Sequence, residues 1–393
     1  MPSGTPGFVG QRLVEAREAR GLTAVALADL LGISRAAVSQ YENGQVTPRP
    51  EVMLKITRVL NLPPQFFSRP IRQREPTPVF YRSMSAATKT ARTRAEWRME
   101  WLCEEIVPYL CGLVDLPEVN FPIVAVDDPS TLTHDEIETA AAEARRFWGL
   151  KDGPISNIVW LLENNGAIVT REEFGAEKLD SFSSWKEDGR PYVFLNADKH
   201  SAVRSRFDAA HEIGHLILHK GFTPGRLRNP ADHRFAEDQA NRFASAFLLP
   251  EQSFGRDIDY PALDRLRALK PKWLVSIGAM LKRAGDLGFI SDSEARHLWI
   301  LYVRRGWKRR EPLDDDLEIE KPRLKSQAFE LLLNQHIQSA DDVLAYIPYP
   351  PSDIEELSVL PRGYLSPKPP AVRLRADVKG KLIHFPSTQR HSN

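Results

Sequence analysis

The residues with the clearest capacity for chemistry are His211, Glu212 and His215, in the run His-Glu-Ile-Gly-His. On a helix, side chains four residues apart lie one turn apart on the same face, so the two imidazoles can converge on one metal ion. Glu212 lies beside them, where a carboxylate can take a proton from a water molecule at that metal. The spacing therefore predicts a metal site that activates water for hydrolysis.

The residues around this run predict the helix that such a site needs. Residues 205–219 contain no proline, and their apolar residues recur with the 3.6-residue period of an amphipathic helix. On a helix, the His-Glu-x-x-His pattern is a signature of zinc metalloproteases. The pattern also arises by chance on ordinary helices, so a third ligand has to support it.

The preferred third ligand is Glu237, at the start of a helix expected over residues 236–249. Asn241 is four residues further on and on the same face, where an amide can orient a ligating histidine. Asp238 and His233 are the alternatives. Asp238 is shorter and turned by about 100° around the helix, and His233 lies in a less regular segment.

No residue is clearly placed by the sequence to stabilise the reacting carbonyl. His219, one turn beyond His215, either donates to that carbonyl or supports the site from the core. Tyr192 and Tyr260 are further donors without positional support. Residues 190–196 predict a strand, which either pairs with an extended substrate at a sheet edge or lies in the sheet interior.

The front of the chain, residues 8–67, predicts a bundle of short helices. Thr23 and Ser34 have the side chains of N-cap residues, and Gly32 ends the helix between them. Two helices joined by a tight turn with glycine form the helix-turn-helix arrangement of DNA-binding proteins. Residues 68–98 contain eight Lys or Arg against two Glu, which favours a polyanionic partner. A protein-interaction module is the alternative.

The run from Gly32 to Gly44 resembles the turn and recognition helix of lambda-repressor-like (Xre) regulators. The resemblance implies that the third helix enters the major groove of double-stranded DNA, where arginine suits guanine and glutamine suits adenine. It also implies a buried ion pair between Arg12 and Glu42 that locks the first helix to the third. Ala24 departs from the family, which usually has glutamine there. The residues implied at the DNA are Ser34, Arg35, Ala36, Ser39 and Gln40.

Residues 204–219 and 240–250 resemble the ImmA/IrrE family of metallopeptidases, and the resemblance covers roughly residues 78–335. Many members carry an Xre domain in front. The resemblance implies a zincin-like (minigluzincin) domain with one Zn²⁺ per chain, and relatives of this kind cut or inactivate repressor proteins. It maps the zinc ligands onto His211, His215 and Glu237, and the catalytic base onto Glu212.

Length and composition agree with a chain of several domains. The 393 residues suggest two or three domains, and 42% hydrophobic residues are enough to form cores. No apolar run approaches the 18 residues of a membrane span, and the N-terminus lacks the basic-then-apolar pattern of a secretion signal. We therefore expect a cytoplasmic protein with no membrane partner.

The expected fold is mainly α with a small β-sheet, of the α+β class. Five regions are expected: a helix-turn-helix domain (8–67), a basic linker (68–85), a metallopeptidase domain (86–312), a helical C-terminal extension (313–365) and a flexible tail (366–393).

Two functions compete for this chain. The first is a DNA-binding regulatory zinc endopeptidase that cleaves a repressor or another regulatory protein. The second is an Xre-family regulator or antitoxin that cuts nothing and uses the peptidase fold as a sensor or to bind a partner such as a toxin. We also expect a homodimer, because palindromic operators mirror two-fold symmetry.

Overall fold

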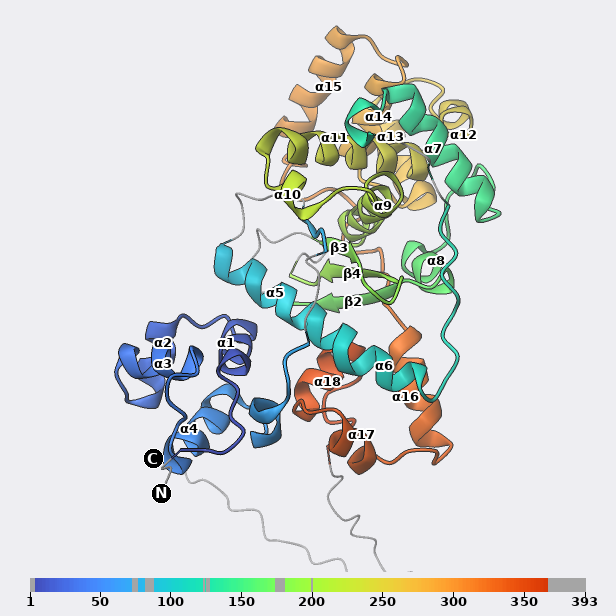
Figure 1. Cartoon of the computed structure of the whole chain (residues 1–393). Helices are drawn as coiled ribbons and strands as arrows, with labels where there is room; N and C mark the ends of the chain where they lie inside the picture. The colour runs from blue at the N-terminus through green and yellow to red at the C-terminus, as the bar shows by residue number, and fades with distance from the viewer. Residues whose placement is uncertain are drawn as a thin grey trace, which may run out of the picture.

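The computed structural model of the chain describes residues 4–72, 77–81, 88–122, 124, 128–173, 181–198 and 201–366. Over these residues helices dominate, and one four-stranded mixed sheet lies near the centre of the molecule (Figure 1). The expected α+β class is confirmed. None of the described helices combines the length and the apolar character that crossing a bilayer requires. Nearly all of the expected tail and parts of the expected linker lie outside the described residues.

The N-terminal bundle forms as its caps predict. Thr23 accepts a hydrogen bond from the backbone N–H of Ala26, and Ser34 accepts one from Ala37, which satisfies a free donor at each helix start. Gly32 ends the second helix in the left-handed conformation, which glycine adopts without strain. The elements are α1 (Gly10–Ala19), α2 (Ala24–Leu31), α3 (Arg35–Glu42), α4 (Pro50–Leu60) and the 3-10 helix η1 (Pro64–Ser68).

The expected ion pair between Arg12 and Glu42 is wrong, because Glu42 pairs with Arg17 at 2.5 Å. The close approach of α1 to α3 occurs at Gly10, where a Cβ atom would lie 2.5 Å from the Glu42 carbonyl oxygen. Arg17 is seven residues from Gly10 and so lies on the same face of α1. Arg12 points away from α3 and contacts Glu15 at 2.6 Å.

We predict that Arg17→Ala lowers the free energy of unfolding of the N-terminal bundle by about 3 kcal/mol, because it leaves the mostly buried Glu42 carboxylate without its arginine. Urea denaturation followed by circular dichroism measures the change. Arg58→Ala, an exposed arginine on α4, is the matched control and should cost less than about 0.5 kcal/mol. Equal costs for the two variants would show that the pair does not lock the bundle.

A long helical segment connects this bundle to the sheet. It consists of α5 (Lys89–Trp101), the π-helical turn η2 (Leu102–Ile106) and α6 (Val107–Cys111). The fully buried Trp101 donates from its indole to Glu15 at 2.8 Å, and Trp97 donates to Glu18 at 2.8 Å. The N-terminal bundle therefore packs on α5 through aromatic side chains that also reach acidic groups of α1.

The sheet has the order β1-β3-β4-β2, with β2 and β4 parallel and the other pairs antiparallel. Residues 191–196 thus lie in the sheet interior, which confirms the interior alternative for this strand and excludes it as a substrate-binding edge. The strands are β1 (Phe80–Tyr81), β2 (Ile168–Glu172), β3 (Phe182–Trp185) and β4 (Pro191–Asn196).

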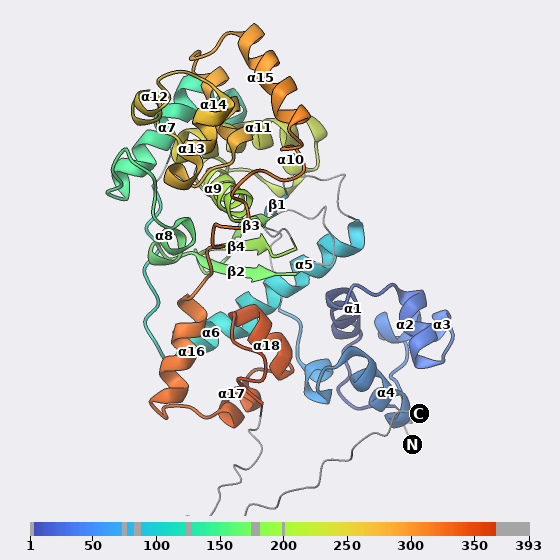
Figure 2. The same cartoon turned by 180° about the vertical axis from the view of Figure 1, so that it is seen from behind.

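Both faces of the sheet are covered, and successive residues of β4 enter different cores. Tyr192 and Phe194 belong to the core shared with α5, α6 and the N-terminal bundle, whereas Val193 and Leu195 belong to a second core on the opposite face of the sheet. The C-terminal helices α16 (Leu324–Asn334), α17 (Ala340–Tyr346) and α18 (Pro351–Ser358) lie with α5 and α6 below the sheet (Figure 2).

On the other face of the sheet, α9 (Ala202–Leu218) packs against β3 and β4, and α11 (Pro230–Leu248) packs against α9. The expected metal ligands lie on these two long helices. Further helices surround them. These are η3 (Pro129–Thr131), α7 (His134–Phe147), α8 (Ile158–Asn164), α10 (Pro224–Leu227), α12 (Glu251–Asp257), α13 (Leu263–Trp273), α14 (Ile277–Asp286) and α15 (Asp292–Arg304).

Candidate metal centre and helix-turn-helix surface

The crossing of α9 and α11 positions the candidate metal ligands. Gly214, inside the His-Glu-Ile-Gly-His run, faces α11, where an added Cβ would lie 3.1 Å from the Cα of Ala240 and 3.2 Å from its carbonyl oxygen. A side chain at this position would push the helices apart. The glycine thus brings the two helices close enough for side chains of both to reach one point.

His211, His215 and Glu237 meet at that point. The Nε2 atoms of the two histidines lie 3.0 Å apart, and the Glu237 carboxylate lies 3.1 Å from His215 Nε2 and 3.4 Å from His211 Nε2. Among the described residues, this is the one group whose ligand atoms all fall within 4.8 Å of one another. The alternative Asp238 is exposed and outside the group.

Hydrogen bonds on the far side of each ring prepare both Nε2 atoms to bind a cation. The side-chain oxygen of Asn241 lies 3.1 Å from His211 Nδ1, so this nitrogen carries the proton and Nε2 presents a lone pair. Gln239 Oε1 lies 2.9 Å from His219 Nε2, and His219 Nδ1 lies 2.9 Å from His215 Nδ1. The Gln239 oxygen requires the proton on His219 Nε2, so His219 Nδ1 accepts the proton of His215 Nδ1. His215 Nε2 is therefore also left unprotonated.

The electrostatics agree with this arrangement. Burial lowers the pKa of His215 to about 4 and holds the pKa of His219 well below its ordinary value, so both rings are neutral at physiological pH. Two imidazoles and one carboxylate converge at this point, which is a ligand set of catalytic zinc sites.

Glu212 is buried beside these ligands and accepts a hydrogen bond from Ser183 Oγ at 2.6 Å. Ser183 lies on β3, far from Glu212 in the sequence, and no local sequence signal identified it. The hydrogen bond orients the carboxylate that the sequence indicates as the base. His233, considered as a third ligand, instead contacts the carbonyl oxygen of Tyr81 at 2.7 Å.

The two tyrosines considered as carbonyl donors are not at the site. Tyr192 lies in the core on the opposite side of the sheet, where its hydroxyl donates to Asp188 at 2.7 Å. Tyr260 is 64% exposed and belongs to neither core. Both ring nitrogens of His219 are engaged, by His215 and by Gln239, so His219 supports a proposed ligand and has no ring nitrogen left to donate to a carbonyl.

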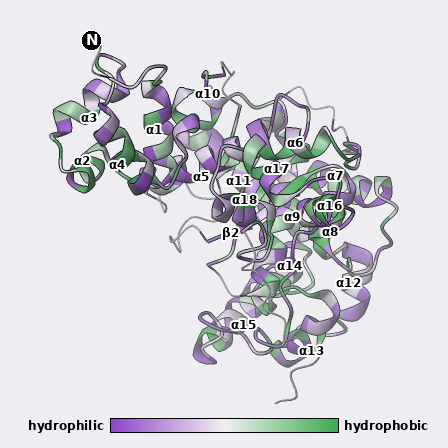
Figure 3. Cartoon of the chain, turned by 90° about the horizontal axis from the view of Figure 1, so that it is seen from below, coloured by the Kyte–Doolittle hydropathy of each residue, from purple (hydrophilic) through white to green (hydrophobic). Residues whose placement is uncertain are grey.

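The residues implied at the DNA lie along one exposed side of the bundle. Val38 anchors α3 in the core, and α3 lies at the outer end of the bundle, which projects from the rest of the molecule (Figure 3). The surface is therefore accessible to a duplex, although Ser34 already caps α3 through its side chain. The exposed residues are Ser34, Arg35, Ala36, Ser39 and Gln40.

We predict that Arg35→Ala weakens binding to the operator by about tenfold or more, because a bidentate arginine–guanine contact is worth about 1–3 kcal/mol. Fluorescence anisotropy with DNA from upstream of the chain's own gene measures this loss. Arg256→Ala, an exposed arginine on α12, is the control and should leave affinity unchanged. Affinity should also fall steeply with salt, and a salt-independent interaction would contradict DNA binding by this surface.

Two family models match the chain, one in each of the two main regions expected from the sequence. Residues 162–284 match the family model of the IrrE N-terminal-like domain, and residues 13–67 match a helix-turn-helix family model. No curated protein matches the chain. The first match contains α9 and α11 with the candidate metal ligands, and the second contains α3. These matches confirm the expected architecture, an Xre-type helix-turn-helix followed by an ImmA/IrrE-like domain.

Proposed function

From a DNA-binding module joined to a peptidase-family domain, we propose that the protein is a regulatory zinc endopeptidase that cleaves a repressor or another regulatory protein. The observation that carries the proposal is the convergence of His211, His215 and Glu237, with both ring tautomers set for a cation. A domain used only to bind a partner has no chemical need for this arrangement. It has equally little need for a buried Glu212 oriented by a serine.

The residues have distinct parts in the proposed reaction. His211, His215 and Glu237 would hold Zn²⁺, which lowers the pKa of a water molecule and polarises the scissile carbonyl when bound. Glu212 accepts the proton of the attacking water and passes it to the leaving amine. Ser183 keeps the Glu212 carboxylate oriented toward the ligands, and the buried surroundings strengthen each electrostatic contact.

The N-terminal bundle would localise the proposed peptidase at DNA. The operator-binding surface of α3 would bring the peptidase region to DNA, where repressors are concentrated. Arg20 of the bundle forms a two-pronged ion pair with Asp353 of α18, at 2.8 and 2.5 Å, so the bundle is attached to the body at a second point besides α5. This attachment supports a chain that acts as one unit on the DNA.

The direct test is cleavage of a purified repressor. The zinc-loaded chain is incubated with repressors encoded by neighbouring genes, and the products are identified by mass spectrometry. We expect one cut in a repressor, and no cut after a chelator removes the metal. A chain with full zinc content that cuts none of them, but still represses its operator or neutralises a toxin, would favour the non-proteolytic regulator or antitoxin instead.

A further inference from the structure

A short segment of the chain, Thr77–Tyr81, lies against the candidate metal centre. Its strand β1 pairs antiparallel with β3, in the register Phe80 to Ser183 and Tyr81 to Phe182. Ser183 is the residue that donates to Glu212. The backbone of Phe80 therefore lies opposite the residue that orients the proposed base, at the edge of β3 where an extended peptide could add to the sheet.

The side chain of Phe80 fills an apolar pocket beside the proposed ligands. Its ring stacks on the imidazole of His215, with centroids 4.7 Å apart and planes 18° from parallel, and is only 2% exposed. Phe80 belongs to neither large core. It forms a separate small cluster with Phe222, Leu227 and Ala236, which lie on the turn before α10, on α10 and on α11. Ala236 directly precedes the proposed ligand Glu237.

The backbone of the segment is held as a bound peptide would be. The Tyr81 carbonyl accepts a hydrogen bond from His233 Nε2 at 2.7 Å, and His233 is one helical turn before Glu237, on the same face of α11. The Pro78 carbonyl accepts one from Ser184 Oγ at 2.8 Å. Main-chain groups thus supply these contacts, while one side chain enters a pocket, which is the recognition mode of an added β-strand.

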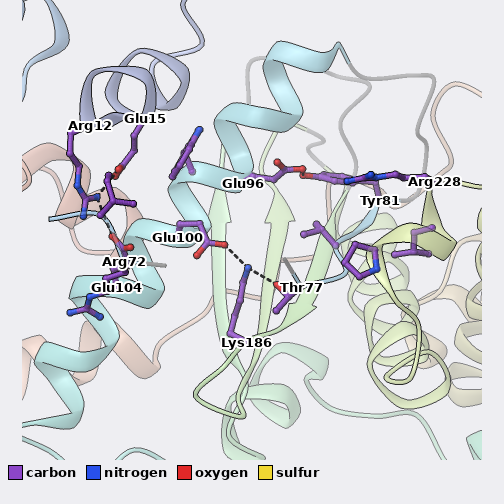
Figure 4. Close-up of a pocket in the computed structure, with 15 residues that line it drawn as sticks. Arg12, Glu15, Arg72, Thr77, Tyr81, Glu96, Glu100, Glu104, Lys186 and Arg228 are labelled. Atoms are coloured by element: carbon purple, nitrogen blue, oxygen red, sulfur yellow. Dashed lines mark hydrogen bonds and ion pairs between the residues drawn. The ribbon is translucent and has the colours of Figure 1, made fainter. Parts of the chain in front are cut away.

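The opposite face of the same segment borders open space. Thr77, Val79 and Tyr81 line a cavity of about 520 Å³, whose far wall is formed by residues of α1 and α5 (Figure 4). Leu227 of α10 also reaches this cavity, at its border with the cluster around Phe80. On this side the Tyr81 hydroxyl donates to Glu96 at 2.8 Å. The segment is therefore bound tightly on the metal side and borders a cavity on the side of the N-terminal bundle.

We propose that Thr77–Tyr81 is an internal pseudosubstrate, and that the pocket of Phe222, Leu227 and Ala236 is a specificity pocket for a large aromatic side chain of an extended peptide. A substrate gains access only when this segment leaves β3. The inference rests on the proposed peptidase function and names its substrate class. His233 donates a hydrogen bond to the carbonyl oxygen of Tyr81, the residue after Phe80. In a bound substrate, it would donate to the carbonyl oxygen of the residue after the aromatic one.

The test measures peptide binding rather than turnover. The full chain, loaded with zinc, is titrated against a fluorescein-labelled peptide Thr-Pro-Val-Phe-Tyr, and mass spectrometry checks that the peptide stays intact. Phe80→Ala empties the pocket and should tighten peptide binding by about tenfold or more, because the competing internal segment is weakened. Val303→Ala removes an exposed apolar side chain on α15, outside the segment and its pocket, and should leave the affinity unchanged.

The peptide itself provides the specificity control. Replacing its phenylalanine by alanine should weaken binding to the Phe80→Ala chain by about tenfold or more, because the pocket is left unfilled. If the two peptides bind equally, or if Phe80→Ala binds no tighter than the unmodified chain, the inference is wrong. Should Phe80→Ala not fold, hydrogen–deuterium exchange of the unmodified chain decides. Excess peptide must then raise deuterium uptake in residues 77–81, and unchanged uptake overturns the inference.

These outcomes are separable from those of the proposed function. If the chain cleaves a repressor but Phe80→Ala does not change peptide binding, the pseudosubstrate inference is wrong and the proposed peptidase function stands. Tighter, phenylalanine-dependent binding by a zinc-loaded chain that cuts nothing would retain the pocket and remove the peptidase.

Discussion

Glu212→Gln is expected to keep one zinc ion per chain and to lose proteolysis. Glutamine preserves the shape of the side chain and can still accept the hydrogen bond from Ser183, but it cannot take a proton from water. General-base catalysis contributes about 10²- to 10⁴-fold to a rate, so the variant should lose at least that factor. Metal analysis by mass spectrometry and the initial rate of repressor cleavage measure the two parts of the prediction.

Ser183→Ala is the matched variant for this experiment. It removes the hydrogen bond to Glu212 and leaves both the base and the metal ligands in place. We expect zinc content to stay the same and the rate to fall by less than in Glu212→Gln. A Glu212→Gln protein that cleaves at the normal rate would remove Glu212 from the mechanism, and one that regulates its target normally would show that proteolysis is irrelevant to regulation.

Glu237→Ala is expected to abolish stoichiometric zinc binding. The two remaining ligands are imidazoles of one helix, whereas a catalytic zinc site takes three protein ligands and keeps one position for water. The substitution also removes the ligand that ties α11 to α9 through the metal. In the unmodified chain, zinc at 100 times its dissociation constant adds about 2.7 kcal/mol of stability. Thermal unfolding with and without zinc should therefore show an increase in Tm only in the unmodified chain.

Asp238→Ala distinguishes the assignment from its alternative. Asp238 follows Glu237 directly, carries the same charge and is exposed, so its loss should change neither zinc content nor the zinc-dependent Tm. Asn241→Leu should bind zinc about 10- to 100-fold more weakly, since the orientation of His211 is lost. A zinc content that falls in Asp238→Ala and not in Glu237→Ala would show that Asp238, and not Glu237, is the third ligand.

The elements that sequence analysis found are those with local signals. The caps at Thr23 and Ser34 and the glycine at Gly32 act within four residues of themselves, and all three behave as expected. The two-residue strand β1 and the four-residue strand β3 were not predicted, because so short a stretch carries no readable alternation. The strand at residues 191–196 was found, but its place inside the sheet depends on those two neighbours.

The ion pair of the N-terminal bundle also depends on a contact that the local sequence does not specify. The sequence offers both Arg12 and Arg17 on α1, and a family pattern favoured Arg12 as the partner of Glu42. The side of α1 that faces α3 is set by the close approach at Gly10, a contact between two helices that neither helix encodes alone.

The sequence by itself determined the parts of the site that lie within one helix. The 3.6-residue period places His211 and His215 on one face of α9, and Glu237 and Asn241 on one face of α11. Only the tertiary structure decided what surrounds them, because helix crossing and strand register join residues that are distant in the chain. The crossing at Gly214 brings the two faces together, and the pairing of β1, β3 and β4 places Ser183 on Glu212 and Phe80 on His215.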